Sequence, residues 1–127
     1  MAALAAIGIV SWDIGESCRF YRTLGLDVPE PSEGEDHFEV TLPNGLRLMW
    51  DTEELIRKLD PEWKRPDGHG MALAFECKDA AEVNETYAAL TDAGFTGKKE
   101  PYDAFWGQRY ANVADPDGNV VDLFAPL

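Results

Sequence analysis

Pro43-Asn44-Gly45, with Leu46, Leu48 and Trp50 after it, is the stretch that decides the fold. Asn-Gly adopts the positive φ angles of a tight hairpin turn, and the apolar residues after it alternate as in a strand. Pro116-Asp117-Gly118 repeats this turn 73 residues later (116 − 43 = 73), ahead of a strand expected at 120–125. The sequence therefore carries the same hairpin signal twice.

The helix starts repeat as well. Asp13 and Asp79 each follow an apolar strand, expected at 4–12 and 71–77, and each opens a helix; they lie 66 residues apart (79 − 13 = 66). Glycines end these helices at Gly25 and Gly94. The second half has seven more residues between helix and hairpin (73 − 66 = 7), which we expect to hold a loop and an edge strand.

This repeat predicts two βαβββ modules, 1–60 and 71–127, joined by a linker at 61–70 within a single domain, 1–127. The expected fold is α+β, a curved and mostly antiparallel sheet around a concave cavity with helices outside. Asp51 with Glu54 resembles a capping box, which predicts a short helix through Leu59.

Composition narrows the function. The chain carries 24 acidic and 11 basic residues, a formal net charge of −13, which argues against a nucleic-acid or anionic-membrane partner. Its two cysteines, Cys18 and Cys77, are too few and too far apart for a disulfide framework or a zinc site, and we expect both to be buried. No apolar run approaches the ~20 residues that span a bilayer. A reduced cytoplasm is the expected location.

Strand side chains alternate between faces, and the more apolar face should pack on the helices. We expect Trp12 in the core, together with Ile7, Ile9, Phe38, Val40, Leu42, Leu46, Leu48, Trp50, Leu73, Phe75, Val121 and Leu123. The other face then holds Ala6, Gly8, Val10, His37, Glu39, Thr41, Arg47, Met49, Asp51, Ala72, Ala74, Glu76, Tyr110, Asn112, Val120, Asp122 and Phe124. Small residues on a floor with polar groups at its rim predict a ligand cavity. The alternative is a solvated face of an antiparallel sheet.

The sequence resembles a known family in two places. The run Phe20-Tyr21-Arg22-Thr23-Leu24-Gly25-Leu26 is similar to the first-helix signature of the vicinal-oxygen-chelate superfamily. Trp106-Gly107-Gln108-Arg109, followed by Asp115-Pro116-Asp117-Gly118-Asn119, is similar to the closing motif of its bleomycin-resistance branch. The superfamily includes glyoxalase I, extradiol dioxygenases, fosfomycin-modifying enzymes and antibiotic-binding proteins, and the last class often works as metal-free dimers.

The resemblance also places the metal ligands of the family's enzymes. These positions carry Ala6, Met49, Ala72 and Asp122 here, and the repeat agrees (6 + 66 = 72, 49 + 73 = 122). Methyl groups cannot coordinate a metal, and a thioether suits Mg, Mn, Fe or Zn poorly. We therefore expect no metal and no cofactor. A site rebuilt from His37 or His69 with Asp122 is the alternative.

Aromatic residues of the second half complete the candidate site. Trp106 matches the family position where a tryptophan stacks on bound drug, with packing under a loop or in a dimer interface as the alternative. Trp63, in the linker, suits a partner surface or a cavity lid. The ligand-binding set we predict is His37, Phe38, Glu39, Arg47, Met49, Tyr102, Phe105, Trp106, Tyr110, Asn112 and Asp122.

These features favour a non-catalytic protein that sequesters an aromatic or cationic antibiotic, most simply as a homodimer. The alternative is an enzyme of the same fold. It would use a rebuilt metal site, or Glu39, Tyr110 or Asp122 as acid or base without a metal.

Overall fold

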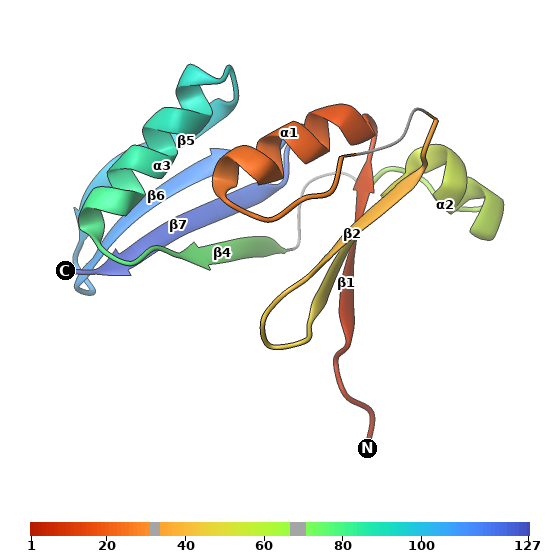
Figure 1. Cartoon of the computed structure of the whole chain (residues 1–127), viewed down its shortest axis with the longest axis horizontal. Helices are drawn as coiled ribbons and strands as arrows, with labels where there is room; N and C mark the ends of the chain where they lie inside the picture. Colours follow the sequence, from red (N-terminus) through yellow and green to blue (C-terminus); the bar gives the residue numbers. More distant parts are fainter. Residues whose placement is uncertain (31–33, 67–70) are drawn as a thin grey trace. The chain divides into compact units, whose positions relative to one another are not determined.

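The computed structural model describes residues 1–30, 34–66 and 71–127. Contacts between residues divide the chain into two compact units, Met1–Arg65 and Pro66–Leu127. The strands form two separate sheets, one in each unit (Figure 1). The first unit adds two helices and the second adds one, so the predicted α+β class is confirmed.

The first unit is built on a three-stranded sheet in the order β1-β3-β2. Its elements are β1 (Ala6–Ser11), α1 (Ile14–Leu24), β2 (His37–Thr41), β3 (Arg47–Thr52) and α2 (Glu53–Leu59). β1 runs parallel to β3, and β2 runs antiparallel to β3. Gly45, at φ 88°, closes the predicted hairpin between β2 and β3, where the Leu42 amide donates to the Leu46 carbonyl at 2.8 Å.

Aromatic rings fill the core of the first unit. Trp50 is fully buried, with Phe38 stacked on it at 4.5 Å between ring centroids and Tyr21 tilted against it at 4.6 Å. Phe20 meets Tyr21 edge to face at 4.9 Å. The indole N–H of Trp50 is buried without a hydrogen-bond partner among the described residues. These rings pack α1 against the face of β2 and β3 that carries Phe38 and Trp50.

The two helix starts in this unit differ in how well the sequence predicts them. Asp13 caps α1 by accepting from the Glu16 amide at 3.0 Å, as predicted. The cap predicted at Asp51 is wrong: Thr52 caps α2 by accepting from the Leu55 amide at 3.1 Å. Asp51 lies within β3, and its carboxylate is hydrogen-bonded to His37.

Among its described residues, the first unit has one strand fewer than a βαβββ module. The described residues between α1 and β2 form no strand. Pro29 cannot donate to a strand ladder, and Arg22 fixes this loop by donating to the carbonyls of Val28 and Pro29, each at 3.2 Å.

The second unit contains a four-stranded sheet in the order β4-β7-β6-β5. Its elements are β4 (Ala72–Glu76), α3 (Ala80–Asp92), β5 (Thr96–Ala104), β6 (Gln108–Ala114) and β7 (Val120–Pro126). β4 runs parallel to β7, and the other neighbours are antiparallel. The edge strand expected in the second half appears as β5.

Helix α3 covers one face of this sheet and contacts β5, β6 and β7 (Figure 1). Asp79 caps it through the Glu82 amide at 2.9 Å, as predicted. Val83 and Leu90 on the helix are fully buried, as are Ala111, Val113, Val121 and Leu123 on the strands. At Gly97 a side chain would collide with the Tyr87 phenol, so glycine lets β5 approach α3 closely.

The turn before β7 is held by one buried carboxylate. Asp115 accepts from the amides of Asp117 at 2.9 Å and Asn119 at 2.8 Å, and from the Asn119 side chain at 2.9 Å. Gly118 takes φ 84°. The Asp-Pro-Asp-Gly-Asn motif is therefore a turn built around its first residue.

Strand parity predicts part of the core correctly. Phe38, Val40, Leu48, Trp50, Val121 and Leu123 are buried, whereas Ile7, Ile9, Leu42, Leu46, Leu73 and Phe75 are half-buried. Both cysteines are buried, and burial raises the pKa of each thiol. The prediction for Trp12 is wrong: it is 60% exposed, because it follows the last residue of β1 and precedes the helix cap.

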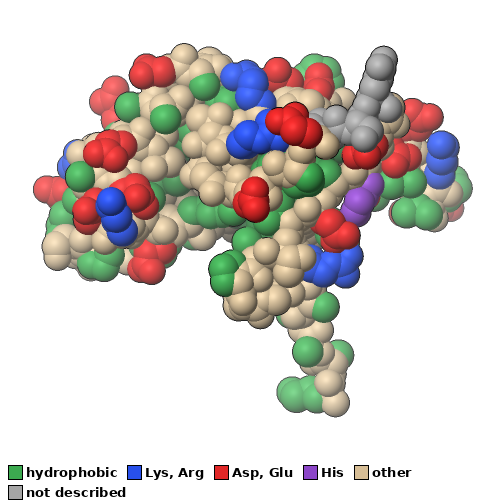
Figure 2. All heavy atoms as spheres, viewed as in Figure 1, with side chains coloured by type: hydrophobic (Ala, Val, Ile, Leu, Met, Phe, Trp, Pro, Cys, Tyr) green, Lys and Arg blue, Asp and Glu red, His purple; other side chains and the backbone are tan. Residues whose placement is uncertain are grey.

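Within the described ranges, no helix is long and apolar enough to cross a membrane. Acidic side chains are scattered over the visible surface (Figure 2).

Candidate functional site

Four aromatic side chains gather on the face of the second sheet that is turned away from α3. We call Tyr102, Trp106, Tyr110 and Phe124 the aromatic face. Tyr110 is at its centre, with ring centroids 5.3 Å from Trp106, 6.3 Å from Tyr102 and 6.3 Å from Phe124. Trp106 and Tyr102 meet edge to face at 6.5 Å.

The register of the sheet creates this arrangement. Tyr102 on β5 pairs with Tyr110 on β6, which pairs with Phe124 on β7. Residues paired directly across neighbouring strands point to the same face. Three rings from three strands therefore form one row, although they are far apart in sequence.

A carboxylate lies beside this row. Asp122 pairs with Asn112 in the register and lies two residues before Phe124 on β7, on the same face of the sheet. The Tyr110 hydroxyl donates to one oxygen of Asp122 at 2.6 Å, and the Asn112 amide donates to the other at 2.6 Å. These two neutral donors fix the orientation of the carboxylate.

Burial and Asp122 together raise the pKa of Tyr110 to about 12. The phenol therefore stays protonated at neutral pH and keeps donating to Asp122. Within residues 1–30, 34–66 and 71–127, no cationic side chain forms an ion pair with Asp122. The carboxylate is thus hydrogen-bonded but has no countercharge in the described part of the chain.

The loop between β5 and β6 carries Trp106 and Phe105. Gly107 closes it at φ 90°, and the indole N–H of Trp106 donates to the Gln108 side chain at 2.7 Å. Trp106 remains 48% exposed, and Phe105, 97% exposed, packs edge to face on it at 5.0 Å. The loop thus places the Trp106 ring against Tyr110 and leaves the Phe105 ring exposed to solvent.

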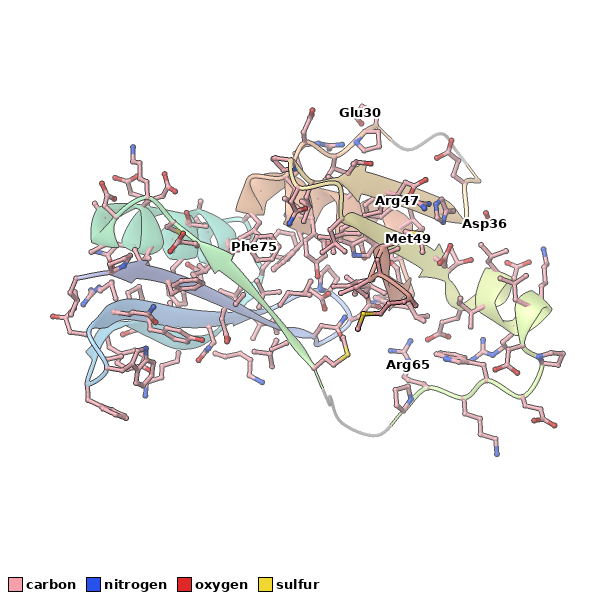
Figure 3. The ribbon with its side chains drawn as sticks, turned by 90° about the horizontal axis from the view of Figure 1, so that it is seen from below. Glu30, Asp36, Arg47, Met49, Arg65 and Phe75 are labelled. Atoms are coloured by element: carbon pink, nitrogen blue, oxygen red, sulfur yellow. The ribbon has the colours of Figure 1, made fainter. Side chains whose placement is uncertain are left out.

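The first unit brings a different set of predicted residues together. We call His37, Glu39, Arg47 and Asp51 the charged row, on the β2–β3 face opposite Trp50. His37 Nδ1 lies 2.5 Å from Asp51 Oδ1, and Arg47 lies 2.7 Å from Glu39. His37 Nε2 is 3.8 Å from Glu39. Met49 lies beside Arg47, with 3.4 Å between Nη2 and Sδ (Figure 3).

The hydrogen bond to Asp51 is the main cause that raises the pKa of His37 above its usual range. The Arg47 guanidinium lowers the pKa of Glu39. Phe38 does not share this face: it is buried on the opposite side of β2 against Trp50.

The positions expected for metal ligands do not fit a metal within either unit. In the first unit Met49 pairs with Gly8 and Glu39, and Ala6 pairs with Arg47. In the second, Asp122 pairs with Ala74 and Ala72 pairs with Val120. In the described part of the chain no three His, Cys, Asp or Glu side chains could hold an ion together. His69 lies outside the described residues.

Two residues in or close to the aromatic face, namely Phe124 and Lys99, were absent from the predicted ligand set. Parity had already put Phe124 on this face, but only the register shows that it extends the aromatic row. Lys99 comes close to Tyr102, with its ammonium 4.2 Å from the ring centroid. Regular alternation would place residues 99 and 102 on opposite faces, so the sequence pattern gave no signal for Lys99.

Comparison with known proteins agrees with this class of fold, in which the first and last strands of each unit pair in parallel. The family model of the Glyoxalase/Bleomycin resistance protein/Dioxygenase superfamily matches residues 3–123. The chain therefore belongs to that superfamily. A search of curated proteins gave no significant match.

Solved structures are similar over nearly the whole chain. A glyoxalase/bleomycin resistance protein/dioxygenase family enzyme from Burkholderia phytofirmans PsJN shares 20% identity and a TM-score of 0.84, over 99% of this chain and 100% of that one. A glyoxalase-related enzyme from Fulvimarina pelagi shares 21% identity and a TM-score of 0.84, over 98% and 88%. A protein from Agrobacterium tumefaciens solved by NMR shares 25% identity and a TM-score of 0.75, over 100% and 99%.

Proposed function

We propose that this protein binds and sequesters, without changing it, a small molecule that combines a flat aromatic ring with a cationic group. The aromatic face of the second unit, with Asp122, is the proposed binding surface. An antibiotic of this chemistry is the proposed ligand class, which makes drug resistance the proposed role. Homodimerisation and a cytoplasmic location complete the proposal and are motivated by family resemblance and composition.

One observation carries the proposal: Asp122 is held beside several rings by neutral donors alone. A carboxylate that is already oriented and has no countercharge among the described residues attracts a cation from outside the chain. The faces of neighbouring rings add cation–π attraction of about 0.5–2 kcal/mol. Stacking on Trp106, which is half exposed, accommodates the flat part of the ligand.

The charge of the whole chain supports the same ligand class. A formal net charge of −13 concentrates cations near the surface and repels anions. The family description includes bleomycin resistance proteins, which supports an antibiotic as the ligand.

The test is a titration of the full chain with a panel of aromatic antibiotics that carry an amine, followed by mass spectrometry of the recovered compound. Binding at micromolar concentration with the compound unchanged is expected. Trp106→Ala should weaken binding by about 1–3 kcal/mol because stacking is lost. Trp12→Ala, which removes an exposed tryptophan of the first unit, is the matched control and should leave the affinity unchanged. A chemically modified product would rule out sequestration.

The second candidate function is an enzyme, and the His37–Asp51 pair is the observation that favours it. A carboxylate on Nδ1 orients an imidazole so that Nε2 can take a proton. Glu39 lies 3.8 Å from that nitrogen and competes for it. This candidate predicts turnover of a bound compound that is lost in His37→Gln. Metal analysis of protein purified without chelator tests its metal-dependent form, which requires a stoichiometric divalent ion.

A further inference from the structure

Strand β5 is irregular where it passes the aromatic face. Its pairing with β6 shifts between Gly97 and Lys99 and again between Lys99 and Tyr102. Each shift inserts one extra residue into β5, as in a β-bulge, and so changes which face the following residues occupy. Gly97 faces α3, as its closeness to Tyr87 shows. Lys99 pairs with Asn112 and Tyr102 pairs with Tyr110, so both lie on the face that holds Asp122.

Two parallel rows therefore cross β5, β6 and β7. The polar row is Lys99, Asn112 and Asp122, and the aromatic row beside it is Tyr102, Tyr110 and Phe124. The polar row begins with a cation and ends with an anion, two strand spacings apart. Its ends are separated by roughly 10 Å at the backbone, given about 4.8 Å between neighbouring strands.

Neither end of the polar row is neutralised within the described residues. Asp122 accepts only from Tyr110 and Asn112. Lys99 forms no ion pair there, and its ammonium rests on the Tyr102 ring at 4.2 Å. Lys99 is exposed and has a long flexible stem, so its ammonium can leave the ring and reach a ligand at little cost.

We propose that Lys99 is a specificity-determining residue of this site and that the two rows select an aromatic ligand with both an ammonium and an anionic group. The ammonium pairs with Asp122, the ring stacks on the aromatic row, and the anionic group pairs with Lys99. This inference rests on the proposed function, which requires only the ring and the cation. It adds an anionic group, carboxylate or phosphate, at the opposite end of the ligand.

A competing role for Lys99 makes the opposite prediction. The Lys99 ammonium occupies a face of Tyr102 that a ligand cation could also use. If Lys99 only competed with the ligand, its removal would strengthen the binding of every cationic aromatic compound. If Lys99 recognises an anionic group, its removal weakens the zwitterion alone.

The experiment uses three benzene-ring probes that carry the ammonium alone, the carboxylate alone or both groups: benzylamine, 4-methylbenzoate and 4-(aminomethyl)benzoate. Each is titrated into the full chain, and binding is followed by NMR shifts of the Trp106 indole and the Asn112 side-chain amide. We expect the zwitterion to bind about three- to fivefold more tightly than benzylamine, and 4-methylbenzoate to bind most weakly. Lys99→Met should abolish the advantage of the zwitterion and leave benzylamine unchanged. Lys98→Met, the neighbouring lysine, is the matched control and should keep the preference.

The outcomes separate the two proposals. If benzylamine shifts no signal of the aromatic face in the wild-type chain, the proposed function fails and this inference fails with it. If benzylamine binds but the zwitterion gains nothing, or Lys99→Met strengthens benzylamine, the role of Lys99 is overturned and the cation site stands. If Lys98→Met removes the preference as fully as Lys99→Met, the effect is one of net charge and the polar row is not its cause.

Discussion

The face of the first sheet that carries the charged row and the face of the second sheet that carries Asp122 differ in how their carboxylates are partnered. In the first unit each carboxylate of the charged row has a basic partner: Asp51 pairs with His37, and Glu39 pairs with Arg47. In the second unit Asp122 has two neutral donors and a set of aromatic rings around it. The carboxylates of the first face are paired with basic side chains, whereas Asp122 on the second face has no basic partner among the described residues.

This difference is the reason why we place the proposed ligand site on the second unit. Cross-strand ion pairs stabilise the β2–β3 hairpin, and a ligand would have to displace them to bind there. On the second unit the protein has already oriented the carboxylate, so a cationic ligand displaces no ion pair of the described residues. We therefore assign the proposed recognition of a cation to the second unit and assign the charged row to stabilisation of the first.

The largest expected effect on stability is at the aromatic core of the first unit. Trp50→Ala removes the ring that joins Phe38 to Tyr21 and should lower the free energy of unfolding by about 3–5 kcal/mol. Urea denaturation measures the loss. Trp12→Ala removes the same side chain from an exposed position and should cost much less. Equal losses in the two variants would contradict the aromatic core.

Tyr110→Phe tests how Asp122 is held. The variant keeps the ring but removes the hydroxyl that donates to Asp122 at 2.6 Å. We expect the free energy of unfolding to fall by about 1.5–3 kcal/mol, because the acceptor is a charged carboxylate. Tyr102→Phe is the control, because the hydroxyl of Tyr102 does not donate to Asp122. A Tyr110→Phe variant as stable as Tyr102→Phe would show that the hydrogen bond contributes nothing.

His37 should make the stability of the first unit depend on pH. Its pKa is raised in the folded chain, chiefly by the hydrogen bond to Asp51. The stabilisation is therefore complete below the unfolded pKa of about 6.5 and is lost as the pH rises through the folded pKa. Because the imidazole is 37% exposed, solvent screening keeps the effect below about 1 kcal/mol. Denaturation of wild type and His37→Gln from pH 5 to 9 should show a difference that shrinks with rising pH. A difference that grows would reverse the assigned sign.

The smallest expected effect is at the exposed pair of the charged row. Arg47→Gln breaks the 2.7 Å pair with Glu39 and should cost about 0.2–1 kcal/mol in urea denaturation, less at high salt. Ligand affinity should not change. A loss of affinity larger than that of Trp106→Ala would move the binding site to the first unit.

Local signals predicted much of this fold from sequence. Caps at Asp13 and Asp79 and the turns at Gly45 and Gly118 depend on residues within a few positions of each other, so the sequence shows them directly. Parity placed Tyr110, Asn112 and Asp122 on one face, since alternation within a regular strand is fixed by geometry.

Features that depend on how one strand pairs with its neighbour were not predictable from the sequence. Lys99 reaches the site only because β5 carries two bulges, which depend on how β5 pairs with β6. Asp51 fails to cap α2 because its carboxylate is engaged by His37, fourteen residues earlier (51 − 37 = 14). In both cases the position of the side chain depends on a residue of the neighbouring strand, which local sequence patterns do not show.

The most direct test of the account compares Asp122→Asn with Asp51→Asn in binding a flat aromatic cation, for which 9-aminoacridine is a suitable probe. Both variants remove one carboxylate charge, so the net charge changes equally. Calorimetric titration should show that Asp122→Asn weakens binding by about 1.5–3 kcal/mol, the range for hydrogen bonds to charged groups, whereas Asp51→Asn leaves it unchanged. Equal affinities for the two variants, or a larger loss in Asp51→Asn, would contradict recognition of the cation by the second unit.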